Sequence, residues 1–129
     1  MLKKLYYYLK PEGFENIETP ENVSATFYLY FKSNKIGELR LNKKTWYFNY
    51  SDEFKENQFI PPITDFPVIN KEYKSEELWP FFMSRIPSLS QPYVIAKIKR
   101  HNSNESNPVD LLKLFGKLTI TNPYTLTSA

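Results

Sequence analysis

The chain has 129 residues, which is enough for one domain with its own hydrophobic core and too few for a catalytic domain plus a separate regulatory one. It has no cysteine, which excludes disulfide scaffolds, thiol catalysis and cysteine-ligated metal centres. Its 17 basic and 14 acidic side chains leave a net charge of +3, which by itself does not indicate a nucleic-acid-binding protein. A 17% aromatic content with three glycines and ten prolines favours a β-rich or α+β fold.

Residues 1–22 combine a short apolar start with an acidic stretch. Tyr6 to Leu9 consists of β-forming residues and predicts a short strand, and the acidic residues and prolines that follow it indicate a loop. No apolar run approaches the roughly 20 residues of a membrane span, and the start has no signal-peptide cleavage pattern. We therefore expect one domain over residues 1–129, beginning at Met1, in the cytoplasm and without membrane contact.

Residues 23–50 show the two-residue alternation of β-strands, interrupted by two turns. From Val23 to Lys32, aliphatic and Phe side chains alternate with tyrosines, so one face is apolar and the other carries tyrosine. A turn at Ser33-Asn34 leads into a strand from Ile36 to Leu41. A second turn at 42–44 leads into a strand from Thr45 to Tyr50. The pattern predicts a three-strand antiparallel meander with one covered face.

The alternation stops at Ser51. Prolines between Phe59 and Ile69 predict an edge strand or an extended loop, because proline cannot donate to a central ladder. A helix follows this segment, and two starts are open for it. Either Ser75 is the N-cap, with acidic residues in the first turn, or Pro80 is the first helical residue.

Two further helices and a strand complete the prediction. Pro92 opens a helix that runs to Arg100, with a narrow apolar stripe. Asn107-Pro108 opens another helix that ends at Gly116, and Leu118 to Ile120 predicts a strand. A small antiparallel meander followed by short helices is an α+β arrangement.

Residues that carry catalysis or hold cofactors are scarce. The single histidine, His101, lies at a predicted helix end and is a poor metal site by itself. The three dispersed glycines form no phosphate-binding loop. The adjacent carboxylates Asp52/Glu53 and Glu76/Glu77 diverge on either a strand or a helix, which favours surface and capping roles. We expect no enzymatic activity, no cofactor and no metal ion.

The aromatic excess has two interpretations. Large side chains on the inner face of a small sheet are typical of a core, which we expect for Phe27, Phe31, Trp46 and Phe48. The segment Leu78–Met83 differs, because every side of a helix there would be apolar. Such a segment is either buried or contacts a partner, and Trp79 is the residue for which both interpretations stay open.

Five stretches in a fixed order resemble the N-terminal subdomain of the HipA family of serine/threonine kinase toxins. They are Phe31–Leu39 with its Ile-Gly-Glu-Leu, Trp46–Tyr50, Pro62-Ile63, Tyr73, and Glu77–Phe82 with its Leu-Trp-Pro-Phe-Phe. The resemblance covers residues 23–120 and implies the small sheet-plus-helices fold of that subdomain. The matching part contains no residues for the ATP-binding lysine, catalytic aspartate or magnesium ligand of the family's kinase core.

A stand-alone copy of this subdomain is similar to the HipS proteins of three-gene HipBST toxin–antitoxin systems. The resemblance implies a non-catalytic antitoxin that binds and restrains a HipT-like kinase, in a complex with a HipB-like DNA-binding protein and without DNA contact of its own. For the kinase interface we expect Trp79 as the leading anchor, with Phe82 and Arg85 beside it and Trp46 as second choice.

A single-stranded nucleic-acid-binding module is the alternative function. The predicted outer sheet face carries three tyrosines on which bases could stack, with basic residues around them. The residues are Tyr28, Tyr30, Tyr47, Lys32, Lys35, Arg40, Lys43 and Lys44. The low net charge weighs against this function, as does the acidic middle of the chain, since residues 51–90 carry seven acidic and four basic side chains.

Overall fold

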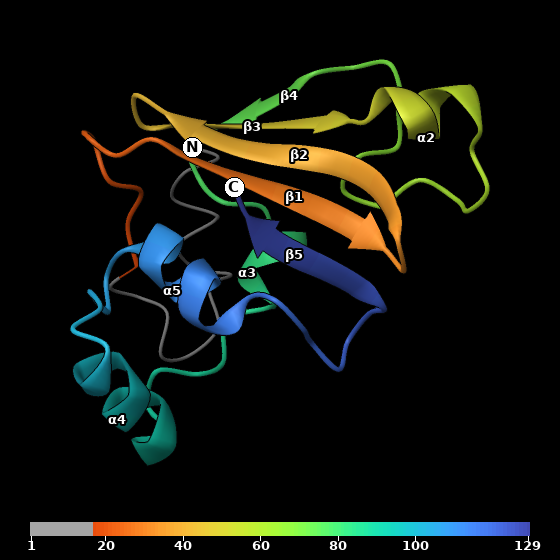
Figure 1. Ribbon diagram of the computed structural model, residues 1–129. Coiled ribbons are helices and arrows are strands. Elements are labelled where there is room, and N and C mark those ends of the chain that lie inside the picture. The colour runs from red at the N-terminus through yellow and green to blue at the C-terminus, as the bar shows by residue number, and fades with distance from the viewer. Residues whose placement is uncertain (1–16) are drawn as a thin grey trace.

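The computed structural model describes residues 17–129, so the strand predicted at Tyr6 to Leu9 lies outside the described residues. Figure 1 shows the arrangement of the elements. In chain order they are β1 (Ala25–Phe31), β2 (Asn34–Asn42), β3 (Thr45–Tyr50), α2 (Asp52–Glu56), β4 (Tyr73–Ser75), α3 (Pro80–Met83), α4 (Pro92–Arg100), α5 (Pro108–Phe115) and β5 (Tyr124–Ser128).

One five-stranded sheet organises the described chain, with the strand order β4-β3-β2-β1-β5 and antiparallel pairing throughout. The predicted meander of three strands forms its centre, and the α+β class is confirmed. Beyond the meander, β4 pairs with β3 and β5 pairs with β1. The outer strands therefore form at Tyr73–Ser75 and Tyr124–Ser128, whereas the sequence indicated an edge strand or loop at 59–69 and a strand at 118–120. Both outer strands come from the half of the chain that was expected to be mostly helical.

The two central hairpins turn on lysines in the left-handed conformation. The first turn is Lys32–Ser33 and not Ser33–Asn34, because Lys32 has φ 55° and Phe31 pairs directly with Asn34. The second turn is Lys43–Lys44, in which both residues have positive φ, 48° and 67°. Two consecutive positive φ values match the right-handed twist of the flanking strands in a two-residue hairpin.

A β-bulge in β2 explains why Ile36 and Gly37 are both buried although they are neighbours. Leu29 pairs with Gly37 while Tyr30 pairs with Lys35, so Ile36 is an extra residue on β2. At position 37 a Cβ atom would lie 2.6 Å from Cζ of Phe48 and 2.7 Å from the carbonyl oxygen of Asn49. Glycine is required here by the close approach of β3.

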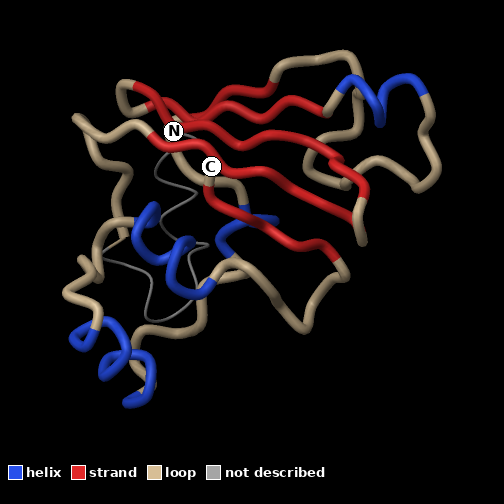
Figure 2. The backbone as a smooth tube through the Cα atoms, viewed as in Figure 1, coloured by secondary structure: helices blue, strands red, loops and turns tan. Residues whose placement is uncertain are grey.

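The core lies between the sheet and the segments that pack on one of its faces. Figures 1 and 2 show α3, α4 and α5 on the same side of the sheet. The predicted core positions Phe27, Trp46 and Phe48 are buried, and Phe31 packs against the core at its margin. The largest fully buried side chains are Trp46, Phe27, Phe48, Phe54, Phe66, Phe82, Ile17, Leu29, Ile36, Leu39, Leu41 and Leu78.

The proline-rich segment is an extended loop that supplies core residues. Ile63 and Phe66 are buried, and the ring of Phe66 stacks on Phe48 with 4.2 Å between centroids. The Tyr50 hydroxyl donates a hydrogen bond to the Phe66 carbonyl (2.6 Å) and accepts one from the Ile63 N–H (2.9 Å). The loop therefore satisfies its backbone through a tyrosine side chain instead of a strand partner.

The structure resolves one open helix start, corrects one predicted strand and adds one helix. Ser75 belongs to β4 and caps no helix, whereas Pro80 is the first residue of α3, the second of the two predicted starts. The segment 118–120 is not a strand: Leu118 and Ile120 are exposed, and the strand forms later, at Tyr124–Ser128. Helix α2 was not predicted; Ser51 caps it by accepting the Phe54 N–H.

No helix formed by residues 17–129 is long and apolar enough to cross a membrane.

Candidate functional site

Two of the four predicted anchors lie in the interior. Trp46 and Phe82 are both 0% exposed. The indole Nε1 of Trp46 donates to the hydroxyl of Thr19 (3.0 Å), which in turn donates to the Glu76 carbonyl (2.8 Å). These two side chains offer no surface to a partner in this fold, and contact with them would require a rearrangement of the core.

Arg85, the third predicted anchor, is 3% exposed, and its guanidinium makes its hydrogen bonds within the chain. Its guanidinium donates to the carbonyls of Gly116 (2.5 Å), Lys117 (2.9 Å) and Tyr124 (2.6 Å) and to Oδ1 of Asn122 (3.1 Å). Burial lowers the pKa of Arg85 to about 10, which leaves the group charged at neutral pH. Arg85 therefore holds the segment 116–124 to the body of the protein.

Trp79 is the one predicted anchor that keeps exposed surface. It occupies the N-cap position of α3 and is partly buried. Its ring packs edge-on against Phe66, with 5.0 Å between centroids. Trp79 therefore fits both sequence interpretations in part: one side of its ring belongs to the core, and the exposed remainder is free to contact a partner.

A groove at the start of α3 was not predicted from the sequence. Its volume is about 390 Å³, and it is lined by Pro61, Pro62, Ile63, Thr64, Asp65, Pro80, Phe81 and Tyr124. Oδ2 of Asp65 accepts the Phe81 N–H (3.0 Å), which supplies the cap that the Trp79 side chain cannot provide. The sequence signal was the proline-rich run followed by Leu-Trp-Pro-Phe-Phe, but the pattern did not show that the two segments meet.

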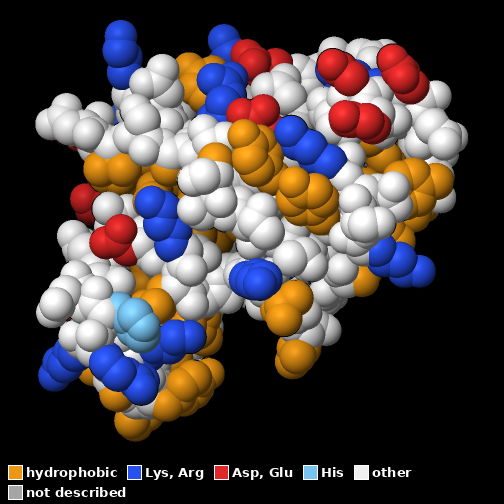
Figure 3. All heavy atoms as spheres, in the orientation of Figure 1, with side chains coloured by type: hydrophobic (Ala, Val, Ile, Leu, Met, Phe, Trp, Pro, Cys, Tyr) orange, Lys and Arg blue, Asp and Glu red, His pale blue; other side chains and the backbone are white. Residues whose placement is uncertain are grey.

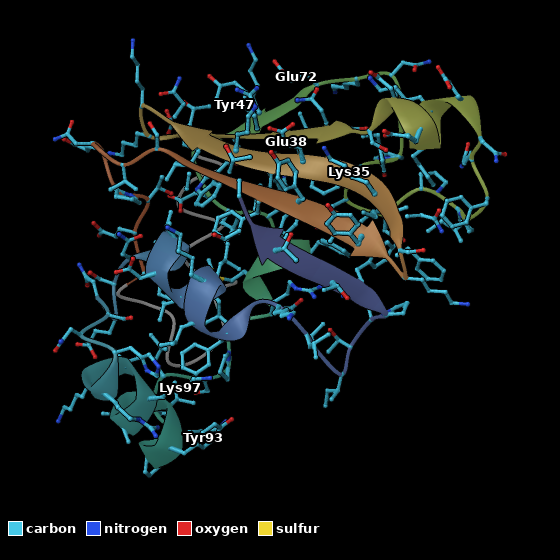
Figure 4. The ribbon with its side chains drawn as sticks, in the orientation of Figure 1. Lys35, Glu38, Tyr47, Glu72, Tyr93 and Lys97 are labelled. Atoms are coloured by element: carbon cyan, nitrogen blue, oxygen red, sulfur yellow. The ribbon has the colours of Figure 1, made fainter. Side chains whose placement is uncertain are left out.

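The second face of the sheet carries tyrosines, as predicted, together with paired charges. Lys35 lies over the Tyr28 ring (4.2 Å from the ammonium nitrogen to the centroid), and Arg40 lies over the Tyr47 ring (4.9 Å from the guanidinium carbon). Glu72 accepts from Arg40 at 3.3 Å. Figure 4 shows Lys35, Tyr47 and Glu72 along this face. We call it the tyrosine face.

A family model described as the HipA N-terminal domain matches residues 27–120 of the 129-residue chain. The chain belongs to the HipA N-terminal domain family. This places it in a HipA-related toxin–antitoxin context and suggests, in general terms, a kinase-toxin partnership. A comparison with curated proteins gave no significant match.

The matched part of the HipA N-terminal domain contains α3, Trp79 and almost all of the groove. Strand β5 and the buried residues Ile17 and Thr19 lie outside the matched range. Tyr124 is the single groove residue beyond the match. The family's segment and the flanking residues thus build one core together.

No group of three or more His, Asp or Glu side chains within residues 17–129 is arranged to hold a metal ion. His101 is exposed and its Nδ1 lies 2.9 Å from the Lys97 carbonyl, at the end of α4 as predicted. Asp52 and Glu53 lie in the first turn of α2, where carboxylates stabilise a helix N-terminus.

Proposed function

We propose that this HipA N-terminal domain protein is a non-catalytic antitoxin subunit that binds and restrains a HipT-like serine/threonine kinase in the cytoplasm. The observation that carries the proposal is the family match, which spans residues 27–120. A HipB-like DNA-binding protein completes the complex, and this chain itself does not contact DNA.

The geometry supports binding through the end of the molecule where α3 begins. Trp79 keeps exposed surface there, and the groove lies beside it at Pro80 and Phe81. Partly exposed aromatic residues next to concave apolar surface are typical of interface hot spots. Phe82 stabilises this surface from the core side through its ring contact with Phe81 at 5.0 Å.

The first experiment is affinity purification of the tagged protein from its own host, with identification of what co-purifies in stoichiometric amount. A kinase with a HipA-type core is the expected partner. Added wild-type protein should then suppress autophosphorylation of that kinase in a purified assay. A stoichiometric complex with an unrelated protein, or full kinase activity in the presence of saturating wild-type protein, would refute the proposal.

Single-stranded nucleic acid on the tyrosine face is a second candidate. The placement of Tyr28 and Tyr47 on one open sheet face favours it. The cations stacked on those rings and the acidic Glu38 and Glu72 on the same face oppose it. Fluorescence anisotropy with a labelled oligonucleotide decides: binding that falls steeply with salt supports this candidate, and no binding at 50 mM salt removes it.

A further inference from the structure

A continuous line of aromatic rings connects α2 to the groove at α3. The centroid distances are 5.9 Å for Phe54–Phe59, 6.0 Å for Phe59–Phe31, 5.7 Å for Phe31–Tyr124 and 5.5 Å for Tyr124–Phe81. Phe59 is 45% exposed, so the row of rings reaches the molecular surface between α2 and the groove. We call these five residues the aromatic strip, and it runs from α2 to the groove.

The groove has the size and stiffness of a pocket for one or two side chains. A volume of about 390 Å³ is near the lower end for ligand sites in proteins. Pro61, Pro62 and Pro80 supply much of the lining, and their rings have few conformations to lose on binding. The groove is therefore preformed for an apolar side chain.

The charges around the groove and the strip favour a basic neighbour for that side chain. Asp65 lines the groove; its Oδ2 is bound to the Phe81 N–H, and within residues 17–129 its Oδ1 makes no hydrogen bond. Figure 3 shows acidic side chains gathered over α2, with apolar side chains next to them. They are Asp52, Glu53 and Glu56. Three lysines lie near them: Lys55 on the same helix, Lys35, whose carbonyl accepts a hydrogen bond from the N-cap Ser51, and Lys32 over the Phe31 ring. Asp65 is the charged residue that lines the groove itself.

We propose that the groove docks a segment of the kinase partner in which a large apolar side chain stands next to an arginine or lysine. The apolar side chain fills the groove between Pro62 and Phe81, and the cation reaches Oδ1 of Asp65. This inference rests on the proposed function for the identity of the partner. It adds where the partner binds and what chemistry the chain recognises.

Two variants test the groove without removing a core residue. Thr64→Trp fills the groove from an exposed position, and we expect it to weaken binding of the co-purified kinase about tenfold or more. Asp65→Asn keeps an acceptor for the Phe81 N–H and removes the charge, and we expect about fivefold weaker binding with a shallower salt dependence. Val68→Trp is the matched control, because Val68 is exposed on the same loop and does not line the groove.

Val68→Trp should bind the kinase with wild-type affinity. All three variants should have the wild-type melting temperature. If wild-type protein binds the kinase and both groove variants bind equally well, the docking inference is overturned while the proposed function stands. If Thr64→Trp does not fold, the Asp65→Asn result decides between these outcomes.

A second measurement is independent of the kinase. The dipeptides acetyl-Phe-Arg-amide and acetyl-Phe-Glu-amide are titrated into the full-length, isotope-labelled protein, and the backbone amide shifts of Asp65 and Phe81 are followed. We expect the Arg peptide to move both signals and to bind about fivefold more tightly than the Glu peptide. Shifts outside the groove, or equal binding of the two peptides, would overturn the inference whatever the outcome for the kinase.

Discussion

The guanidinium of Arg85 donates a hydrogen bond to the carbonyl oxygen of Tyr124 at 2.6 Å, on the side of β5 that faces away from β1. The next outward group along this edge, the Leu126 N–H, donates to the Lys117 carbonyl at 3.0 Å. Arg85 and the loop it holds therefore occupy polar groups that an exposed edge strand would offer to another chain. Arg85 and the loop thus make the β5 edge less available for pairing with a strand of another chain.

Replacing Arg85 should destabilise the protein strongly. Arg85→Met keeps much of the side-chain volume and leaves four oxygen acceptors without their donor, which we expect to cost about 3 kcal/mol of unfolding free energy. Arg85→Lys should lose less, because an ammonium retains three donors. Urea denaturation followed by tryptophan fluorescence measures the unfolding free energy of both variants. A loss below about 0.5 kcal/mol for Arg85→Met would show that the Arg85 hydrogen bonds contribute little to stability.

The Thr19 hydroxyl should be needed for the burial of Trp46. Thr19→Val preserves the shape and leaves the indole N–H without an acceptor in the core, at a cost of about 2 kcal/mol. Thr19→Ser retains the hydroxyl and is the matched control. Equal melting temperatures for the Val and Ser variants would contradict this role of the hydrogen bond.

Stability should fall at alkaline pH because of Tyr50. Burial raises the pKa of Tyr50 from 10.0 to about 12, so between these values the folded state keeps a proton that the unfolded state has released. This contribution is fully present below pH 10 and is lost as pH rises to 12, by about 2 to 3 kcal/mol.

Tyr50→Phe should remove that pH dependence. At pH 7 the variant is less stable than wild type, because Phe66 O and Ile63 N lose their partner, and the difference should shrink at pH 11. Urea unfolding of both proteins at pH 7, 9 and 11 measures it. Ile98→Ala, a core variant on α4 without a titrating group, controls for general alkaline weakening, and a constant difference for Tyr50→Phe would refute the prediction.

Trp79→Ala should reduce both stability and kinase binding, because the side chain is shared between core and surface. Loss of the packing on Phe66 should cost about 2 kcal/mol of unfolding free energy, less than a fully buried tryptophan. Binding of the kinase should weaken by about 2 kcal/mol. Ile98→Ala, in the buried face of α4, is the control for a purely structural loss, and unchanged affinity in folded Trp79→Ala would exclude Trp79 from the interface.

The second hairpin turn should tolerate a more favourable sequence. Lys43→Asn with Lys44→Gly places residues that accept positive φ at both positions, and we expect a gain of about 1 kcal/mol. The double alanine variant removes the same charges, including the exposed contact of Lys44 with Glu21 at 3.7 Å, and leaves the strained φ values. Thermal unfolding compares the two, and equal melting temperatures would show that the turn conformation costs little.

The alternation from Ala25 to Tyr50 determined the centre of the fold. Its period of two decides which side chains face inward, so Phe27, Trp46 and Phe48 could be assigned to the core without a structure. Helices α4 and α5 were equally visible, because Pro92 and Asn107-Pro108 mark their starts and Gly116 marks the end of α5. These signals are local and depend on few residues.

Tertiary contacts decided what the local pattern left open. β4 has only three residues, too few to show an alternation, and β5 alternates over only five residues. Each forms as a strand because an existing strand offers an edge. Likewise, nothing in the sequence around Arg85 shows that its acceptors lie 31 to 39 residues further on. The groove at Asp65 and Phe81 exists for the same reason, because it forms only where two distant segments meet.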